Sequence, residues 1–133
     1  MARKPSRKTI VKNLDTIFSI YIRMRRAKNE ISECVTCGKK DHWRAMQAGH
    51  FMSRKFYSTR WDERNVEVQC MGCNVYRYGE QFKFSKHLGQ DLSDELLAES
   101  RKTVKFADYE LIEMIDLYKK KVEDLKKDKN KVK

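Results

Sequence analysis

Proline and glycine are scarce in this sequence, and long apolar runs are absent. It has one proline, Pro5, and five glycines in 133 residues, so no proline- or glycine-rich linker marks a domain boundary. No apolar run approaches the roughly 20 residues that cross a bilayer, and the first residues lack the apolar core of a signal peptide. We therefore expect one domain of ordinary size in the cytoplasm, with no membrane partner.

Acidic residues are outnumbered by basic ones, 19 against 30, which gives a formal charge of +11. Residues 1–28 hold nine Lys and Arg against one acid, and residues 119–133 hold eight against three. Residues 34–86 hold ten basic and five acidic residues, whereas residues 87–118 are acidic overall. This balance favours a polyanionic partner such as nucleic acid, and it predicts that phosphate groups meet residues 34–86 and the two ends of the chain.

Cysteine is sparse too, and its four residues form two Cys-x-x-Cys pairs, Cys34 with Cys37 and Cys70 with Cys73. In a reducing compartment, two such pairs favour thiolate ligands of one zinc ion over disulfides. A redox motif of this kind would ordinarily occur once, beside a βαβ pattern. Four thiolates leave no open coordination position, so the predicted zinc is structural.

Apolar residues recur at helical spacing near both ends of the chain. Residues 9–28 are expected to form an amphipathic helix, whose apolar positions are Val11, Leu14, Ile17, Phe18, Tyr21, Ile22 and Met24. A longer helix is expected to begin near Asp108, with an apolar stripe made of Leu111, Met114, Ile115, Tyr118, Val122 and Leu125. This stripe either joins two copies of the chain in a homodimer, which we favour, or packs on the first helix.

The segment between and after the cysteine pairs has a mixed pattern. Two short strands are predicted at residues 47–52 and 65–69, joined by a loop. Helices are expected at residues 74–78 and 81–88, and Ser93 is placed to cap a further one.

Together these patterns predict an α+β fold that is mostly helical. Residues 1–33 supply a basic arm and the N-terminal amphipathic helix, residues 34–89 the zinc-stapled core, and residues 90–133 a helical extension that ends in a Lys-rich tail. The three parts are expected to form one domain, in which zinc replaces the apolar core that the short polar middle segment cannot build.

A strand, a loop, a strand and a helix inside a zinc bracket resemble the ββα-metal core of HNH nucleases. In particular, the chain resembles the NinG (Rap) family of phage recombination proteins in the segments Gln47-Ala48-Gly49-His50-Phe51, Arg60-Trp61-Asp62-Glu63-Arg64-Asn65 and Gln69-Cys70-Met71-Gly72-Cys73-Asn74. The resemblance implies a metal-dependent endonuclease that hydrolyses phosphodiester bonds in branched DNA, such as a Holliday junction or a D-loop, in the host cytoplasm. It also implies a catalytic Mg²⁺ or Mn²⁺ in addition to the structural zinc.

The candidate catalytic residues are His50, Asn65 and Asn74. An imidazole titrates near pH 6.5, so His50 can be neutral and accept the proton of an attacking water. By the resemblance, Asn74 binds the catalytic Mg²⁺ or Mn²⁺ through its side-chain oxygen, and Asn65 orients the loop that carries His50. The candidate DNA-binding cations are Arg54, Lys55, Arg60, Arg64 and Arg77 near the scissile phosphate, and Arg23, Arg25 and Arg26 at the end of the first helix, where they either complement the helix dipole or contact phosphate.

Position 49 departs from the HNH pattern, because many of these enzymes have an acidic or histidine metal ligand there and this chain has Gly49. Three explanations stay open. The catalytic metal is held by fewer protein groups, or a carboxylate such as Asp62, Glu63 or Asp41 reaches it, or His50 is itself a ligand and another group activates the water. Two other functions also stay open: a zinc-containing DNA-binding module without catalytic activity, and a nuclease that acts on RNA.

Overall fold

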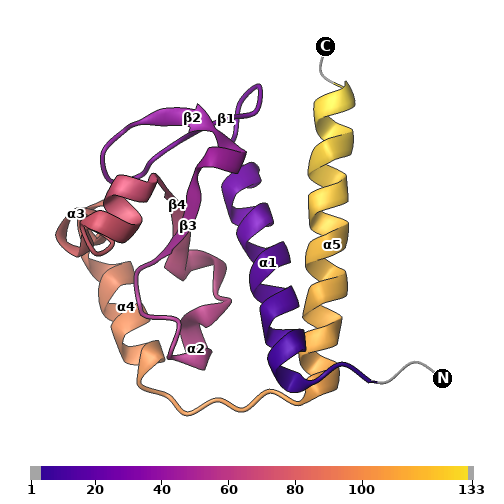
Figure 1. The fold of residues 1–133 in the computed structure, drawn as a ribbon. Helices are drawn as coiled ribbons and strands as arrows, with labels where there is room; N and C mark the ends of the chain where they lie inside the picture. Colours follow the sequence, from indigo (N-terminus) through magenta and orange to yellow (C-terminus); the bar gives the residue numbers. More distant parts are fainter. Residues whose placement is uncertain (1–3, 132–133) are drawn as a thin grey trace.

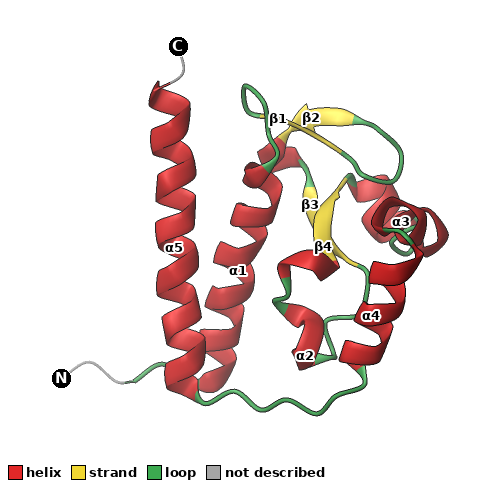
Figure 2. Ribbon diagram, turned by 180° about the vertical axis from the view of Figure 1, so that it is seen from behind, coloured by secondary structure: helices red, strands yellow, loops and turns green. Residues whose placement is uncertain are grey.

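Two long helices form one side of the molecule. The computed structural model describes residues 4–131, with side chains to residue 128. Helices α1 (Arg7–Arg25) and α5 (Asp108–Lys131) lie side by side and run in the same direction (Figure 1). Helix α1 begins two residues before the predicted start at residue 9. At the starts of the two helices, Arg7 donates a hydrogen bond of 2.9 Å to Asp108. All other elements lie on the opposite side of α1 from α5 (Figure 2).

The apolar stripe of α5 packs on α1 within the chain. Its buried members are Leu111, Ile115, Tyr118 and Val122, and those of α1 are Ile10, Leu14, Phe18, Ile22 and Met24. The rings of Phe18 and Tyr118 meet edge to face, with centroids 4.9 Å apart. Full burial stabilises each such side chain by about 2–3 kcal/mol. The stripe therefore packs on the first helix within one chain, which is the second of the two alternatives. Its buried residues are not available to join two copies of the chain, so the homodimer stays a prediction without this surface.

The four strands form two separate antiparallel pairs. Strand β3 (Gln47–His50) pairs with β4 (Val66–Gln69), which places His50 opposite Val66. These are the two strands that the sequence predicts. The other pair, β1 (Ile31–Glu33) with β2 (Lys40–His42), was not predicted, and it carries the first cysteine pair in its turn.

Short helical elements fill the remainder of this half. The predicted loop between β3 and β4 contains a helix, α2 (Tyr57–Arg60), and a 3₁₀ turn, η2 (Glu63–Asn65). A 3₁₀ turn, η1 (Trp43–Ala45), precedes β3. The second cysteine pair begins a π-helical turn, η3 (Gly72–Tyr76), in place of the predicted helix at 74–78.

Helix α3 (Gln81–Leu88) has the predicted bounds, and α4 (Gln90–Ser100) follows it directly. The prediction that Ser93 caps α4 is wrong, because the helix begins three residues earlier. Ser93 lies inside it, and its hydroxyl donates to the carbonyl of Gly89 at 2.7 Å. A serine that bonds back to the preceding turn does not need to start a helix.

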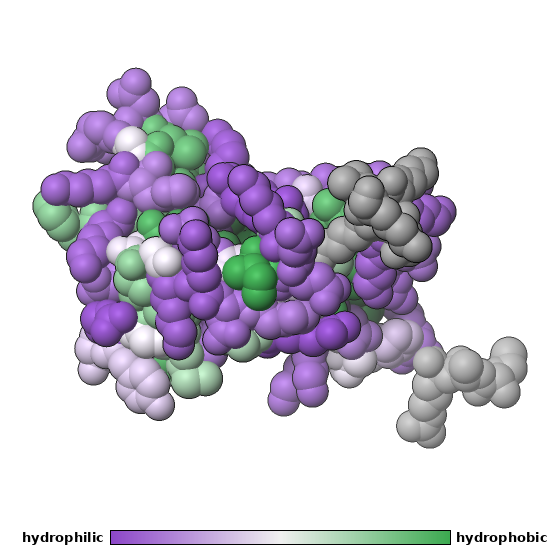
Figure 3. All heavy atoms as spheres, turned by 90° about the horizontal axis from the view of Figure 1, so that it is seen from above, coloured by the Kyte–Doolittle hydropathy of each residue, from purple (hydrophilic) through white to green (hydrophobic). Residues whose placement is uncertain are grey.

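The fold is thus mostly helical, with two small sheets and a four-cysteine cluster. Within residues 4–131, no helix is long and apolar enough to cross a membrane. Seen from above, the surface is mainly hydrophilic, and its apolar patches are small and separated (Figure 3).

Candidate zinc cluster and pocket

The four cysteines meet at one point between the β1–β2 turn and the start of η3. Their sulfur atoms all lie within 4.8 Å of one another, and those of Cys37 and Cys70 are 3.6 Å apart. In a tetrahedral zinc site with Zn–S bonds of about 2.3 Å, sulfurs are about 3.8 Å apart. The spacing, the all-sulfur donor set and the burial of Cys34, Cys70 and Cys73 fit a structural zinc ion.

The two thiols of the first cysteine pair differ in pKa. Burial raises the pKa of Cys34, but hydrogen bonds from the Thr36 hydroxyl and from backbone groups outweigh it and lower the pKa to about 6. A backbone hydrogen bond from Lys39 lowers the pKa of Cys37, but burial and the neighbouring sulfurs outweigh it and raise the pKa to about 12. Thiolates packed this closely repel one another, and a divalent cation removes that repulsion.

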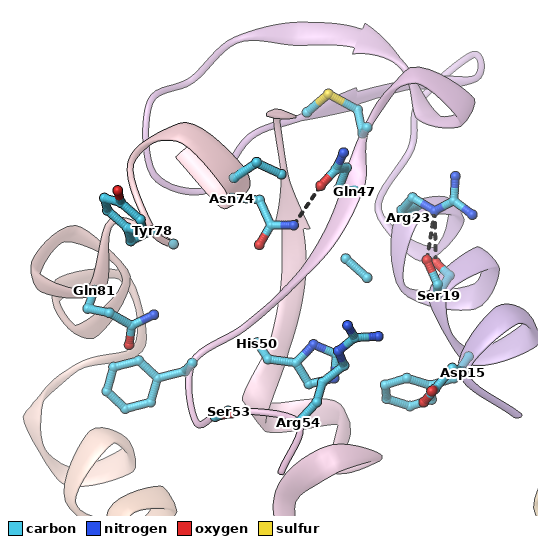
Figure 4. A pocket seen from close by; sticks show the side chains of 16 residues that line it. Asp15, Ser19, Arg23, Gln47, His50, Ser53, Arg54, Asn74, Tyr78 and Gln81 are labelled. Carbon is cyan, nitrogen blue, oxygen red and sulfur yellow. Dashed lines mark hydrogen bonds between the residues drawn. The ribbon is translucent and has the colours of Figure 1, made fainter. Parts of the chain in front are cut away.

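An open pocket of about 840 Å³ lies beside the cluster, between α1, β3 and the turn after η3. His50 and Asn74 both line it, together with Arg23 and Arg54 (Figure 4). His50 comes from the end of β3, and Asn74 follows the last cysteine in η3. The structure therefore brings two of the three predicted catalytic residues to one cavity, along with two of the predicted cations.

The ring of His50 has a defined tautomer. Its Nε2 atom lies 2.9 Å from the carbonyl oxygen of Arg60, which can only accept, so Nε2 carries the proton and Nδ1 keeps its lone pair. Burial is the largest cause of a pKa of His50 lowered to about 4; the charge of Arg54 acts in the same direction, while the hydrogen bond to the Arg60 carbonyl opposes both. The imidazole is therefore neutral at physiological pH, which a proton acceptor requires.

Asn65 does not line the pocket. It is fully buried under the loop after β3. Its amide donates to the carbonyls of Met52 at 3.1 Å and Thr59 at 3.0 Å, and its side-chain oxygen accepts from the Met52 amide at 2.7 Å. Its own carbonyl accepts from the amide of Phe51, next to His50. Three of these four bonds attach the loop that follows His50 to the end of η2, and the fourth attaches α2 to it.

The side chain of Asn74 is oriented by Gln47. Its amide nitrogen donates to the Gln47 side-chain oxygen at 2.7 Å, and its backbone amide bonds to the Cys70 carbonyl. With the nitrogen held by Gln47, the oxygen points down into the pocket, on the side of His50 (Figure 4). An amide oxygen in this position is suited to a hard cation such as Mg²⁺.

Gly49 has a steric explanation. A Cβ atom at this position would lie 1.8 Å from the side-chain oxygen of Gln69, whose side chain passes directly over the glycine. Gln69 is fully buried, and it donates to the Thr36 hydroxyl at 3.1 Å and to the Gly79 carbonyl at 2.8 Å. The space that a side chain at position 49 would need is therefore occupied by Gln69, which joins β4 to Thr36 in the first cysteine pair and to Gly79 in the turn after the second.

Most of the predicted DNA-binding cations contact a carboxylate or a sulfur of the protein itself, although Arg26, Arg64 and Arg77 are exposed. The five are Arg25, Arg26, Arg60, Arg64 and Arg77. Arg25 and Arg26 both bond to Glu67, whose side chain is only 4% exposed. Arg77 donates to the sulfur of Cys73 at 3.4 Å. Each of the five guanidinium groups therefore has a partner within the protein and does not need nucleic acid to supply one.

Three of the predicted cations have no carboxylate within salt-bridge distance among the described residues. Arg54 and Arg23 line the pocket, where Arg23 donates to Ser19 at 3.1 Å. Lys55 is exposed and lies over the ring of Phe56, 5.0 Å from its centre. Arg54 comes closest to the predicted role, because its charge acts on His50 and no carboxylate lies within salt-bridge distance of it among the described residues (Figure 4).

The acidic groups are placed differently from the prediction. Asp62 does not line the pocket, because it caps η2 and pairs with Arg64 at 2.8 Å. Asp15 lines it instead, but its oxygens accept two hydrogen bonds from Arg60 and one from Trp61. Apart from the cysteines, no group of three or more metal-ligating His, Cys, Asp or Glu occurs in the part of the chain that the structure describes.

Asp15 was not among the predicted site residues. It holds Arg60, whose carbonyl in turn fixes His50. One signal was present in the sequence, because Asp15 is the single acid in the basic first 28 residues and follows the apolar Leu14. Its partner is 45 residues away, so the sequence did not indicate what this acid contacts.

These features define a small, mostly helical α+β protein with a candidate four-cysteine zinc site beside a polar pocket. The family described as "Bacteriophage Lambda NinG protein" matches residues 1–129. The chain therefore belongs to the NinG family of phage recombination proteins. Comparison with the curated proteins and with the solved structures gives no match.

Proposed function

We propose that this NinG protein is a metal-dependent endonuclease of the HNH type, which hydrolyses phosphodiester bonds in branched DNA. The single observation that carries the proposal is that His50, at the end of β3, and Asn74, in η3, line one pocket. The order of elements supports it as well, since β3, a loop, β4 and the helical turn η3 follow one another as in a ββα-metal core.

In the proposed reaction, neutral His50 accepts the proton of a water through Nδ1, because Nε2 is bonded to Arg60. A phosphate in the pocket would pair with Arg54. Since the charge of Arg54 lowers the pKa of His50, this pairing raises that pKa toward its ordinary value and makes the imidazole a stronger base. Arg54 and Arg23 supply positive charge as negative charge builds on the phosphate.

The catalytic cation, Mg²⁺ or Mn²⁺, would polarise the phosphate and stabilise the leaving oxygen. Asn74 is the residue that fits it, through the side-chain oxygen that Gln47 leaves free. Gln69 blocks any ligand at position 49, and Asp62 lies elsewhere, so few protein ligands are offered. A cation that keeps most of its waters tolerates such a site.

A second function has a specific observation in its favour. The pocket holds no cluster of three ionisable ligands, which suits a DNA-binding module that does not cleave. One experiment separates the two. Zinc-loaded protein is incubated with a four-way junction, a linear duplex and a single strand of the same sequences, with Mg²⁺, with Mn²⁺ and with neither.

Cleavage of the junction that requires added Mg²⁺ or Mn²⁺ and exceeds cleavage of the duplex supports the nuclease. Binding of all substrates without cleavage under any metal condition would contradict it and support the binding module. A matched RNA junction in the same assay tests the preference for DNA, because cleavage of RNA alone would overturn the proposed substrate.

A further inference from the structure

The turn between η3 and α3 has an unusual backbone. Tyr78, Gly79 and Glu80 have φ values of +52°, +88° and +48°, so three successive residues adopt the left-handed region. Only glycine does so without steric cost, and a tyrosine in this region is uncommon. Such conformations persist only where the surroundings enforce them, and they cluster at functional sites.

Two hydrogen bonds enforce this turn. The amide of Gly79 donates to the Cys73 carbonyl at 2.7 Å, and the carbonyl of Gly79 accepts from the buried side chain of Gln69 at 2.8 Å. The turn is thus attached to the cysteine cluster on one side and to β4 on the other. Any zinc ion that holds Cys73 also holds the turn.

The consequence is an aromatic ring kept out of the core. Tyr78 is 89% exposed and lies at the edge of the pocket that holds His50 and Asn74 (Figure 4). A single exposed tyrosine on a protein surface needs no explanation. Tyr78 differs because a turn with an unfavourable backbone conformation holds it at the pocket, where its ring gains no burial in the core. Tyr76 and Phe82, on either side of it in sequence, are 74% and 73% exposed.

The charges of this segment indicate what the ring would meet. Between residues 71 and 88 the cations are Arg77, Lys83 and Lys86, and the only acid is Glu80, which pairs with Lys83. Lys86 lies over the ring of Phe82, 4.5 Å from its centre. Exposed aromatic rings among cations are the means by which proteins bind unpaired nucleotides, with the rings stacking on bases and the cations meeting phosphates.

We propose that Tyr78 is a specificity-determining residue that stacks on an unpaired nucleobase next to the phosphate in the His50 pocket. This proposal rests on the proposed function, because it takes the phosphate to be part of DNA. It deepens that function by naming the group that would distinguish a branched substrate with unpaired bases, such as a D-loop, from a duplex. A paired base is already stacked on its neighbours, so the ring gains contact only where a base is free.

The experiment uses the full, zinc-loaded chain without added Mg²⁺ or Mn²⁺, so that binding is measured apart from cleavage. The probes are a duplex with one unpaired 2-aminopurine and the same duplex fully paired, together with an RNA copy of the unpaired strand. The variant is Tyr78→Asn, because asparagine tolerates a positive φ and removes the ring without straining the turn. Tyr78→Phe keeps the ring, and Tyr109→Ala removes another exposed tyrosine, 65% exposed, from α5, outside the pocket.

We expect wild type and Tyr78→Phe to quench 2-aminopurine and to prefer the unpaired probe. Tyr78→Asn is expected to lower that preference by about 5- to 150-fold, the range for loss of one stacked base. Its melting temperature should be unchanged or higher, and Tyr109→Ala should keep the preference. An equal loss on both probes, or no loss, would overturn the proposal, as would a wild type without any preference. Absence of cleavage by wild type in the nuclease assay would refute the proposed function and leave this binding result standing.

Discussion

The side-chain oxygen of Gln69 lies only 1.8 Å from the position that a Cβ atom on Gly49 would occupy. The two residues stand on paired strands, and Gln69 also bonds to Thr36 near the first cysteine pair and to Gly79 after the second. One buried amide therefore connects the backbone beside His50 to the cysteine cluster and to the turn that carries Tyr78.

The contact predicts a specific coupling between positions 49 and 69. Gly49→Ala should lower the free energy of unfolding by about 1–3 kcal/mol, because the new methyl group displaces Gln69. In a Gln69→Ala background the same change should cost much less, since the obstructing side chain is gone. Denaturant unfolding of the four proteins with zinc present gives the coupling energy, and strictly additive effects would contradict the account.

The pKa of His50 predicts how stability depends on pH. The folded state lowers this pKa to about 4, whereas the unfolded chain has about 6.5. Between these values the unfolded state binds more protons, so the contribution is complete above pH 6.5 and is lost as pH falls toward 4. By linkage, the titration of His50 should lower the free energy of unfolding by about 2 kcal/mol as the pH falls from 7 to 5.

The matched variant is His50→Gln, whose amide can still donate to the Arg60 carbonyl. Between pH 7 and pH 5, the free energy of unfolding of His50→Gln should fall by about 2 kcal/mol less than that of wild type. Subtracting the two curves removes the contribution of all other titrating groups. Parallel curves for the two proteins would show that the imidazole is not held neutral by burial.

The cysteine cluster predicts dependence on zinc. Cys34→Ser or Cys70→Ser should unfold the segment between the pairs, because structural zinc contributes on the order of 10 kcal/mol in small domains. The measurements are zinc content per chain and the melting transition. A Cys34→Ser protein that keeps the native melting transition and binds as much zinc would refute this role.

Substitution of Arg54 should affect DNA binding, whereas substitution of Arg25 should affect stability. Arg54→Ala should leave the melting temperature unchanged, since Arg54 has no carboxylate partner among the described residues, and it should weaken duplex binding with a salt dependence reduced by about one ion. Arg25→Ala should destabilise by about 3 kcal/mol, because Glu67 is buried and would lose one of its two cations. Thermal unfolding and salt-dependent anisotropy measure both, and equal effects of the two substitutions would contradict this division of roles.

The sequence predicted the parts of the fold that depend on local pattern. The apolar spacing of Leu14 and Phe18 indicated α1, and the breaks around Gln81–Leu88 indicated α3. The β1–β2 pair escaped prediction because each strand has only three residues, too few for an alternating pattern. The start of α4 was misplaced because Ser93 is as suitable for bonding inside a helix as for capping one.

The candidate site divides in the same way. The spacing of the cysteines predicted the four-cysteine cluster. The positions of His50 and Asn74 relative to the cysteines predicted that the two residues lie close together, and both line one pocket. The partners of the arginines could not be predicted, because Arg25 and Arg60 bond to acids more than 40 residues away in sequence. Ion pairs of this kind are decided by packing, and charge in a sequence does not tell which cations remain free.

The central claim is that His50 is the proton acceptor of a phosphodiester hydrolase, and single-turnover cleavage of a four-way junction tests it most directly. The comparison is between wild type, His50→Ala and His87→Ala, which removes an imidazole from outside the pocket. We expect His50→Ala to slow cleavage by about 100- to 10,000-fold, the usual contribution of a general base, and His87→Ala to cleave as wild type does. Equal cleavage by His50→Ala and wild type would contradict the account.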